Sequence, residues 1–232
     1  MEDMYLKICD WDNIYLAYLK ARKCKRYKDE ILKFSYSIEN NLLNIHSDLL
    51  NEKYIHGKYY EFIVNDSKKR VIQAAPFKDR IIHHSLCNIV EPIFDKKFIF
   101  DTYACRKNKG SHKAIKRFRE FLRAIKLKNS LVGYDNIYCL KCDVVKYFDS
   151  VDQEILFSLI KKRIANGKVL KLIKIVIDSY IKGIPIGNLT SQLFANIYLN
   201  ELDFYIKHTL KCKYYIRYMD DFIILNLEKA KL

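Results

Sequence analysis

The sequence predicts an α+β protein in which one antiparallel sheet carries helices on one face. A β-prone stretch at residues 137–145 is followed by two helical patterns and then by paired β-prone runs at 214–225. The chain has 232 residues, 50% of them hydrophobic, which suffices for a large core. Three prolines and six glycines leave no linker-like segment, so we expect any subdomains to share one continuous packed body.

The first 73 residues predict two helices and a hairpin. Apolar residues recur at helical spacing over 13–50, a range that includes the basic run Lys20–Arg26. This run fits either contact with a nucleic-acid backbone or a solvated helix face. Apolar stretches in 59–73 flank the turn-forming cluster Asn65–Arg70, so we expect a hairpin with a basic tip.

A helix is predicted over residues 77–90, because apolar residues stand at positions 81, 82, 86, 89 and 90. We expect it to end near Pro92, which cannot continue a helix interior. The adjacent His83 and His84 project about 100° apart on a helix, so they make a poor metal pair.

The stretch Ile137–Val145 predicts a buried strand that ends at a carboxylate, Asp143. Burying an unpaired carboxylate costs several kcal/mol, so a cation or a metal is expected beside it. Ser150–Gln153 predicts a capping box that opens a helix. The turn Gly183–Gly187 then leads into a long apolar helix at 193–206.

The stretch 214–225, "YYIRYMDDFIIL", predicts a second hairpin with Asp220 and Asp221 at its tip. A hairpin turn selected for stability alone would carry Asn-Gly or Asp-Gly. Asp220 and Asp221 depart from this turn preference, and such departures often mark a functional site. If this hairpin neighbours the strand that ends at Asp143, three carboxylates meet at one sheet edge. Oxygen-only ligands suit Mg²⁺, with Mn²⁺ as a substitute, and two such ions catalyse phosphoryl transfer.

The composition indicates a polyanionic partner. The net charge is +15 and the pI is near 9.3, which favours nucleic acid over the alternative that the basic surface only aids solubility. No apolar run is long enough to span a bilayer and Met1 opens no secretory signal, so we expect a cytoplasmic protein with no membrane contact. The seven cysteines, including Cys139 and Cys142, are expected to be reduced thiols and not a zinc site.

Tyr218–Asp221 between β-forming runs, together with Asp143–Phe148, resembles the two catalytic motifs of reverse transcriptases. The resemblance implies the fingers and palm of a right-hand polymerase and an RNA-directed DNA polymerase activity. It also implies Mg²⁺ ligands at Asp143, the neighbouring Val144, Asp220 and Asp221. The expected partition is N-terminal helices and fingers at 1–94, palm at 95–150, a fingers–palm connection at 151–188 and palm again at 189–232. Because the sequence stops at Leu232, soon after the hairpin, the thumb is expected to lie outside a truncated chain.

The resemblance also assigns binding residues. In the family pattern Phe148 is the bulky side chain that excludes a ribose 2′-OH. The expected contacts to the incoming nucleotide are Lys69, Arg70, Arg80, Phe148, Ile186, Gly187 and Gln192. The expected contacts to the nucleic acid are Arg106, Lys107, Lys109, Tyr218 and Met219. The turn at 107–112 has too few glycines for a phosphate-binding loop, so a basic turn near a nucleic-acid backbone is expected.

The stretch 184–192, "IPIGNLTSQ", has Ile186 where retroviral and group II intron enzymes usually have glutamine, and it ends in Gln192. With residues 71–80 and 101–112, it is similar to reverse transcriptases of bacterial and phage diversity-generating retroelements. That resemblance implies copying of a template RNA into cDNA with substitutions at adenines, using dNTPs, a DNA or RNA primer and an RNA–DNA duplex. It also implies a small basic helical accessory protein.

Three alternatives remain at this point. A group II intron-type or a defence-associated reverse transcriptase shares the chemistry, and a truncated chain without catalysis would be a nucleic-acid-binding remnant. Intact Asp143, Asp220 and Asp221 favour an enzyme, because a pure binding surface gains nothing from acids that face phosphate. For Ile186 a contribution to low fidelity stands beside the simpler interpretation of an apolar turn residue.

Overall fold

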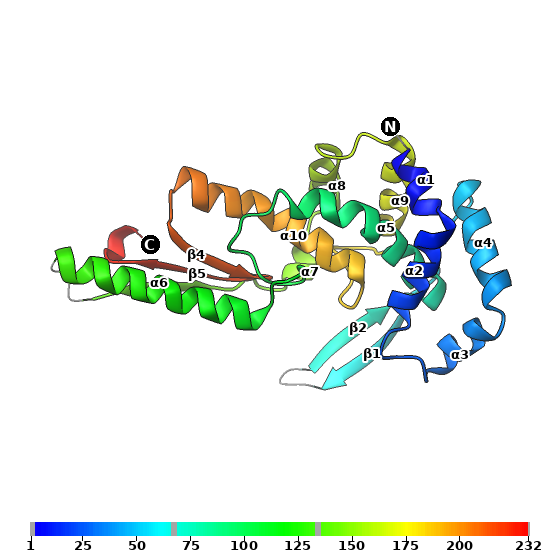
Figure 1. Cartoon of the computed structure of the whole chain (residues 1–232), viewed down its shortest axis with the longest axis horizontal. Coiled ribbons are helices and arrows are strands. Elements are labelled where there is room, and N and C mark those ends of the chain that lie inside the picture. The colour runs from blue at the N-terminus through cyan, green and yellow to red at the C-terminus, as the bar shows by residue number, and fades with distance from the viewer. Residues whose placement is uncertain (1–2, 66–68, 133–135, 232) are drawn as a thin grey trace. The chain divides into compact units, whose positions relative to one another are not determined.

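The computed structural model describes residues 3–65, 69–132 and 136–231. It divides into two compact units, which are coloured along the chain in Figure 1. Unit 1 comprises Met1–Lys96 and Phe148–Phe194, and unit 2 comprises Lys97–Tyr147 and Ala195–Leu232. The short helix α7 (Tyr147–Ser150) and the long helix α10 (Leu189–Phe204) contain the two later boundaries. Within the described residues, no helix combines the length and apolar composition needed to cross a membrane.

Unit 1 is built on helices that enclose an apolar core. Its elements are α1 (Met4–Cys9), α2 (Trp11–Ala21), α3 (Asp29–Tyr36), α4 (Ile38–Leu50), β1 (Tyr60–Asn65), β2 (Lys69–Ala74), α5 (Phe77–Asp95), α8 (Gln153–Lys161) and α9 (Gly167–Asp178). Helix α5 packs most extensively on α2, and Ile14, Ile81 and Ile82 are fully buried. This packing fixes the position of the hairpin β1–β2, which joins α4 to α5.

The N-terminal helices differ from the prediction. Residues 13–50, predicted as two helices, lie in three, because a turn after Ala21 and a break at Ser37 separate α2, α3 and α4. A further helix, α1, precedes them and is capped by the side chain of Asp3. The basic run Lys20–Arg26 begins in the last turn of α2, and from residue 22 onward it forms turns, since the helix ends at Ala21. The interpretation of the whole run as a helix face is therefore wrong.

Two further helix ends required correction. Helix α5 continues through Pro92 to Asp95, since a proline in the last turn removes only one backbone hydrogen bond. Helix α8 is capped by Asp152, whose Oδ1 accepts from the N–H of Ile155 at 2.9 Å, and not by the predicted Ser150 box. The β1–β2 hairpin is confirmed, with Tyr60 opposite Ala74, and its predicted basic tip includes residues 66–68, which lie outside the described residues.

Unit 2 contains a three-stranded antiparallel sheet in the order β3-β5-β4. Its strands are β3 (Tyr138–Cys142), β4 (Tyr214–Tyr218) and β5 (Asp221–Asn226). The helical elements are α6 (Ser111–Val132), the last part of α10, a π-helical turn (Tyr205–Thr209) and a 3₁₀ turn (Lys229–Lys231). The predicted hairpin at 214–225 is confirmed, and its partner strand is the one predicted to end at Asp143.

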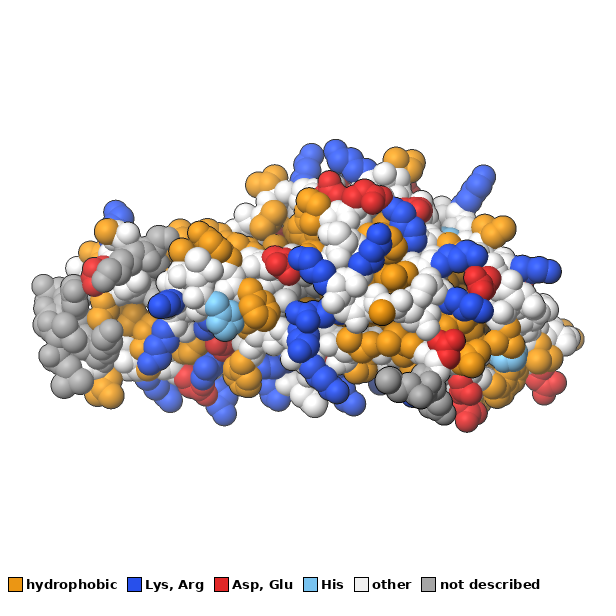
Figure 2. Space-filling view, turned by 90° about the horizontal axis from the view of Figure 1, so that it is seen from above, with side chains coloured by type: hydrophobic (Ala, Val, Ile, Leu, Met, Phe, Trp, Pro, Cys, Tyr) orange, Lys and Arg blue, Asp and Glu red, His pale blue; other side chains and the backbone are white. Residues whose placement is uncertain are grey.

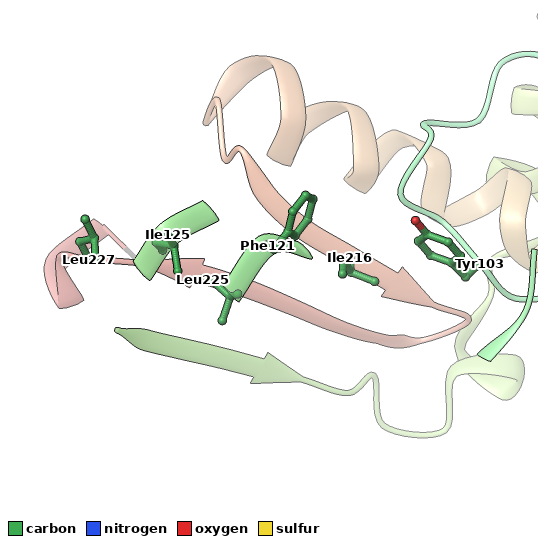
Figure 3. Close-up of a cluster of buried hydrophobic side chains, with 6 residues drawn as sticks. All are labelled: Tyr103, Phe121, Ile125, Ile216, Leu225 and Leu227. Atoms are coloured by element: carbon green, nitrogen blue, oxygen red, sulfur yellow. The ribbon is translucent and has the colours of Figure 1, made fainter. Parts of the chain in front are cut away.

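Helices cover both faces of this sheet, so the prediction of helices on one face is wrong. On one face Phe121 and Ile125 of α6 pack with Ile216 and Leu225, the cluster that Figure 3 draws. On the other face Ile206 packs with Tyr215 and Ile224. The reason is that successive strand residues point to opposite faces, and both sets in β4 and β5 are apolar.

Candidate active site

The three predicted catalytic carboxylates lie at one end of the unit 2 sheet. Asp143 directly follows β3, whose last residue, Cys142, pairs with Phe222 of β5. Extending this register by one position puts residue 143 opposite Asp221. Asp220 is next to Asp221, in the two-residue turn that joins β4 to β5. The hairpin therefore brings Asp220 and Asp221 to the strand end that carries Asp143.

The turn at the hairpin tip has an unusual backbone. Met219 has a φ of 57°, in the left-handed region that non-glycine residues seldom adopt. Holding such a residue there costs on the order of 1–3 kcal/mol, so surrounding contacts have to maintain it. Its carbonyl accepts a hydrogen bond of 2.7 Å from Nη1 of Arg217. A neighbouring side chain thus holds the turn that carries Asp220.

Arg217 is the centre of a buried polar network. The residue is 0% exposed, and its Nε and Nη2 donate to the two carboxylate oxygens of Asp203 at 2.8 and 2.6 Å. Nη1 also donates to Oδ1 of Asn196 at 3.1 Å, and the hydroxyl of Tyr215 donates to Asp203 at 2.7 Å. Bidentate arginine–carboxylate pairs fix geometry as well as charge. The network joins helix α10 to the hairpin.

The electrostatics of this network favour the ion pair. Burial works against the charged form of Arg217, but the hydrogen bonds and charge of Asp203 outweigh it and raise the pKa of the guanidinium. Burial raises the pKa of the Tyr215 hydroxyl, and the charge of Asp203 raises it further. Arg217 therefore stays charged and Tyr215 stays a neutral donor.

The backbone of Arg217 is anchored as well. Its N–H donates to the carbonyl of Asp101, and its own carbonyl accepts from the N–H of Tyr103, both at 3.0 Å. The Asp101 carboxylate in turn accepts from Arg117 Nε at 2.9 Å and from Lys207 Nζ at 3.1 Å. Residues 101–103 thereby extend the sheet beside β4 and fix the strand that leads to the turn.

Sequence reasoning missed Arg217, Asp203 and Asn196. The available signal was a charged residue inside an apolar run: Arg217 between Ile216 and Tyr218, and Asp203 within an apolar helix. A buried charge is costly unless it is paired, so opposite charges in two neighbouring core elements predict a pair.

The donor set at the sheet end fits a magnesium ion, because three carboxylates supply the oxygen ligands that Mg²⁺ prefers. As the side chains are placed, no three His, Cys, Asp or Glu residues of the described chain converge closely enough to hold a metal ion. Asp143 and Asp221 are exposed and Val144 is partly buried. Metal binding would therefore require the carboxylates to turn toward one point.

In unit 1 the structure brings the predicted nucleotide-binding residues Ile186 and Gly187 to strand β2 and joins Phe148 to the same turn. The carbonyl of Phe148 accepts from the N–H of Ile184 at 2.9 Å, and the carbonyl of Ile186 accepts from the N–H of Gln73 at 3.1 Å. Gly187 has a φ of 123°, and a Cβ there would lie 2.8 Å from Cγ2 of Ile72. Glycine is thus required where this turn meets β2.

The other predicted nucleotide contacts of unit 1 lie apart from that turn or outside the described side chains. Lys69 is exposed at the start of β2, and the side chain of Arg70 lies outside the described residues. Arg80 is on α5, paired with Glu30, so it serves the packing of that helix. Gln192 is a partly buried residue near the start of α10.

The predicted nucleic-acid contacts of unit 2 fall into two groups. Arg106 donates to the carbonyl of Ile99 at 2.8 Å, and Lys109 donates to the carbonyl of Phe100 at 2.7 Å, so both stabilise their own loop. Lys107 is exposed, as is Tyr218. The partly buried Met219 contributes its turn carbonyl to Arg217.

Basic side chains are spread over the face seen in Figure 2 and do not gather in one patch. With a net charge of +15, this distribution attracts polyanions to a broad surface. A broad field of this kind steers association but carries no information on sequence.

The chain belongs to the reverse transcriptase (RNA-dependent DNA polymerase) family, whose model matches residues 63–232. It is similar to Protein YkfC of Escherichia coli (strain K12), with 27% identity over 61% of this chain and 38% of that protein. It is also similar to the group II intron-encoded protein LtrA of Lactococcus lactis subsp. cremoris, with 29% identity over 65% of this chain and 25% of LtrA. The chain thus spans well under half the length of these relatives.

A solved structure supports the fold assignment. The partial Cas6-RT-Cas1–Cas2 complex contains a chain that superimposes on 98% of this chain, covering 39% of its own length, with a TM-score of 0.56 and 20% identity. The mixture of helices and antiparallel sheets is consistent with the fingers and palm of a reverse transcriptase.

Proposed function

We propose that this chain catalyses RNA-templated DNA synthesis, with Asp143, Asp220 and Asp221 as its catalytic carboxylates. The observation that carries the proposal is their position at one end of the β3-β5-β4 sheet, in a chain of the reverse transcriptase family. Two Mg²⁺ ions held there would activate the primer hydroxyl and stabilise the leaving phosphate oxygen. Asp143 and Asp221 offer exposed carboxylates, while Arg217 fixes the turn that carries Asp220.

The proposed contacts to the incoming dNTP are the residues that the family pattern assigns. Ile186 and Gly187 are candidates because their turn is joined to β2, the strand that carries Lys69 and Arg70, and Phe148 is hydrogen-bonded to the same turn through Ile184. Phe148 would lie against the sugar and reject a 2′-OH. The proposed partition assigns residues 1–94 to helices and fingers, 95–150 and 189–232 to the palm, and 151–188 to their connection.

The finer class we propose is the error-prone enzyme of a bacterial or phage diversity-generating retroelement, acting in the cytoplasm with a small basic accessory protein. Ile186 and Gln192 in the 184–192 stretch support it. A group II intron-type enzyme is the second candidate, favoured by the similarity to LtrA and to nuclear intron maturase 1 of Arabidopsis thaliana, at 28% identity over 46% of this chain and 14% of that protein. A variable repeat beside the gene, differing from a template repeat at adenines, would favour the first class, and an enclosing intron the second.

Primer extension tests the proposed activity. This chain, and the longest reading frame that contains it, are assayed on the same primer annealed to an RNA or to a DNA template. We expect dNTP incorporation on RNA that requires Mg²⁺ or Mn²⁺. Incorporation by neither protein on RNA, while both remain folded and bind the primer–template, would contradict the proposal and favour a binding remnant.

A further inference from the structure

Helix α6 (Ser111–Val132) has two chemically different faces. Its apolar side chains pack into the cluster of Figure 3, and they are Ala114, Phe118, Phe121, Leu122 and Ile125. At 3.6 residues per turn, five other positions fall within an arc of about 80°, centred roughly 135° around the helix from that face. They are His112, Lys116, Arg119, Arg123 and Lys126, all exposed, and together they are called the basic stripe. One exposed side of the helix therefore carries a basic residue on each turn, with Glu120 and Leu127 beside it.

The charges at the centre of the basic stripe are not compensated within the described protein. No described residue forms an ion pair with Lys116, Arg119 or Arg123. The nearest acid on the helix, Glu120, is paired with Arg117 at 3.1 Å, on the flank of the stripe. Like charges three or four residues apart destabilise a helix, so this arrangement opposes the stability of α6.

On helix α9, by contrast, three lysines are paired with acids. Lys168 and Lys171 both pair with Glu52 at 3.0 Å, and Lys174 pairs with Glu154 at 2.6 Å. Lys116, Arg119 and Arg123 of α6 have no such acid partner among the described residues.

We propose that the basic stripe of α6 is a docking surface for the phosphate backbone of RNA, in addition to the carboxylate end of the sheet. Its lysines and arginines, from Lys116 to Lys126, extend about 15 Å along the helix, at 1.5 Å per residue, and repeat one cation each turn. Such a row neutralises successive phosphates without reading bases. The choice of RNA as the polyanion rests on the proposed RNA-templated activity, and the surface itself rests on the geometry of α6.

The test is binding of a labelled RNA hairpin to the full chain, by fluorescence anisotropy at several KCl concentrations without dNTP or Mg²⁺. Each phosphate contact contributes about 0.7–0.9 to the slope of log affinity against log salt. The double variant Arg119→Gln/Arg123→Gln is expected to lower the steepness by about 1.4–1.8. Its affinity at intermediate salt should fall about tenfold.

Two controls make the result specific. Lys162→Gln/Arg163→Gln removes the same charge from exposed positions of unit 1, and Arg119→Lys/Arg123→Lys keeps the charge on α6. Both should retain the wild-type slope. An unchanged slope for the α6 glutamine variant, or an equal loss in the unit 1 control, would overturn the proposal.

Binding of a DNA duplex, measured in the same way, tests the choice of RNA. Primer extension by the same variants separates this surface from catalysis. Weakened binding of a DNA duplex with unchanged RNA binding would overturn the assignment to RNA. If the slope changes as expected but primer extension fails, the docking surface stands and only the proposed activity is contradicted.

Discussion

Replacing Arg217 with methionine is expected to destabilise unit 2 strongly. The side chain is 0% exposed, and its removal leaves the fully buried Asp203 with the Tyr215 hydroxyl as its remaining hydrogen-bond donor among the described residues. Removing one partner of a buried ion pair costs about 3–5 kcal/mol, because the remaining charge is uncompensated. The variant also leaves the carbonyl of Met219 without its 2.7 Å donor, which loosens the turn beside Asp220.

Hydrogen exchange of peptides covering residues 214–226 measures the opening free energy of the β4–β5 hairpin itself, since local opening reports the stability of each element. The matched control is Arg119→Gln, an exposed arginine of the same unit, which should change the opening free energy by less than about 0.5 kcal/mol. Nucleotide addition should fall with Arg217→Met, because the turn that carries Asp220 is no longer held.

A double variant separates the buried charge from lost packing. In Arg217→Met/Asp203→Asn both charges are gone and the asparagine oxygen still accepts from Tyr215. We expect it to recover about 2 kcal/mol relative to Arg217→Met, since replacing a buried pair costs much less than breaking it. A double variant as unstable as the single one would refute the reasoning that the unpaired Asp203 charge causes the loss.

Three other predictions concern unit 1. Burial, together with the charges of His56 and His84, lowers the pKa of His83 to about 3. The unfolded chain binds this proton near pH 6.5 and the folded chain only near pH 3, so stability present above pH 6.5 is lost as the pH falls, by about 2 kcal/mol at pH 5. Urea unfolding at pH 7 and pH 5 should show that loss reduced in His83→Phe, and identical losses in both proteins would disprove it. Phe148→Ala should raise ribonucleotide incorporation relative to dNTP in competition assays, and an unchanged ratio removes Phe148 from sugar selection. Ile186→Gln should lower errors opposite template adenine by up to about tenfold in sequenced cDNA, because a glutamine amide restores an orienting contact, and equal error rates would end that hypothesis.

Sequence patterns that span only a few residues predicted the strands and hairpins correctly. The hairpins at 59–73 and 214–225 follow from β-prone runs around turn residues, and the structure contains both. The sequence placed Asp143 at a strand end, and the structure has it there. The catalytic and binding roles of these residues remain predictions.

Features that depend on packing between distant segments could not be predicted from the sequence. Helix α6 was not predicted because it has more basic residues than residues in its apolar stripe, which contains Phe121 and Ile125. The second covered face of the sheet was missed because a strand that is apolar on both sides does not reveal what packs on it. The pairing of Arg217 with Asp203 joins residues of different elements, which no local spacing shows.

The most direct test of the central claim is single-turnover dNTP incorporation on an RNA template by the longest reading frame that contains this chain, compared with its Asp143→Asn and Asp220→Asn variants. Each substitution removes one proposed metal ligand with little change in size. We expect incorporation to fall by more than about 10²-fold in each variant, with unfolding temperature and RNA affinity retained. Incorporation at the wild-type rate in either variant would contradict the assignment of these carboxylates as the catalytic site.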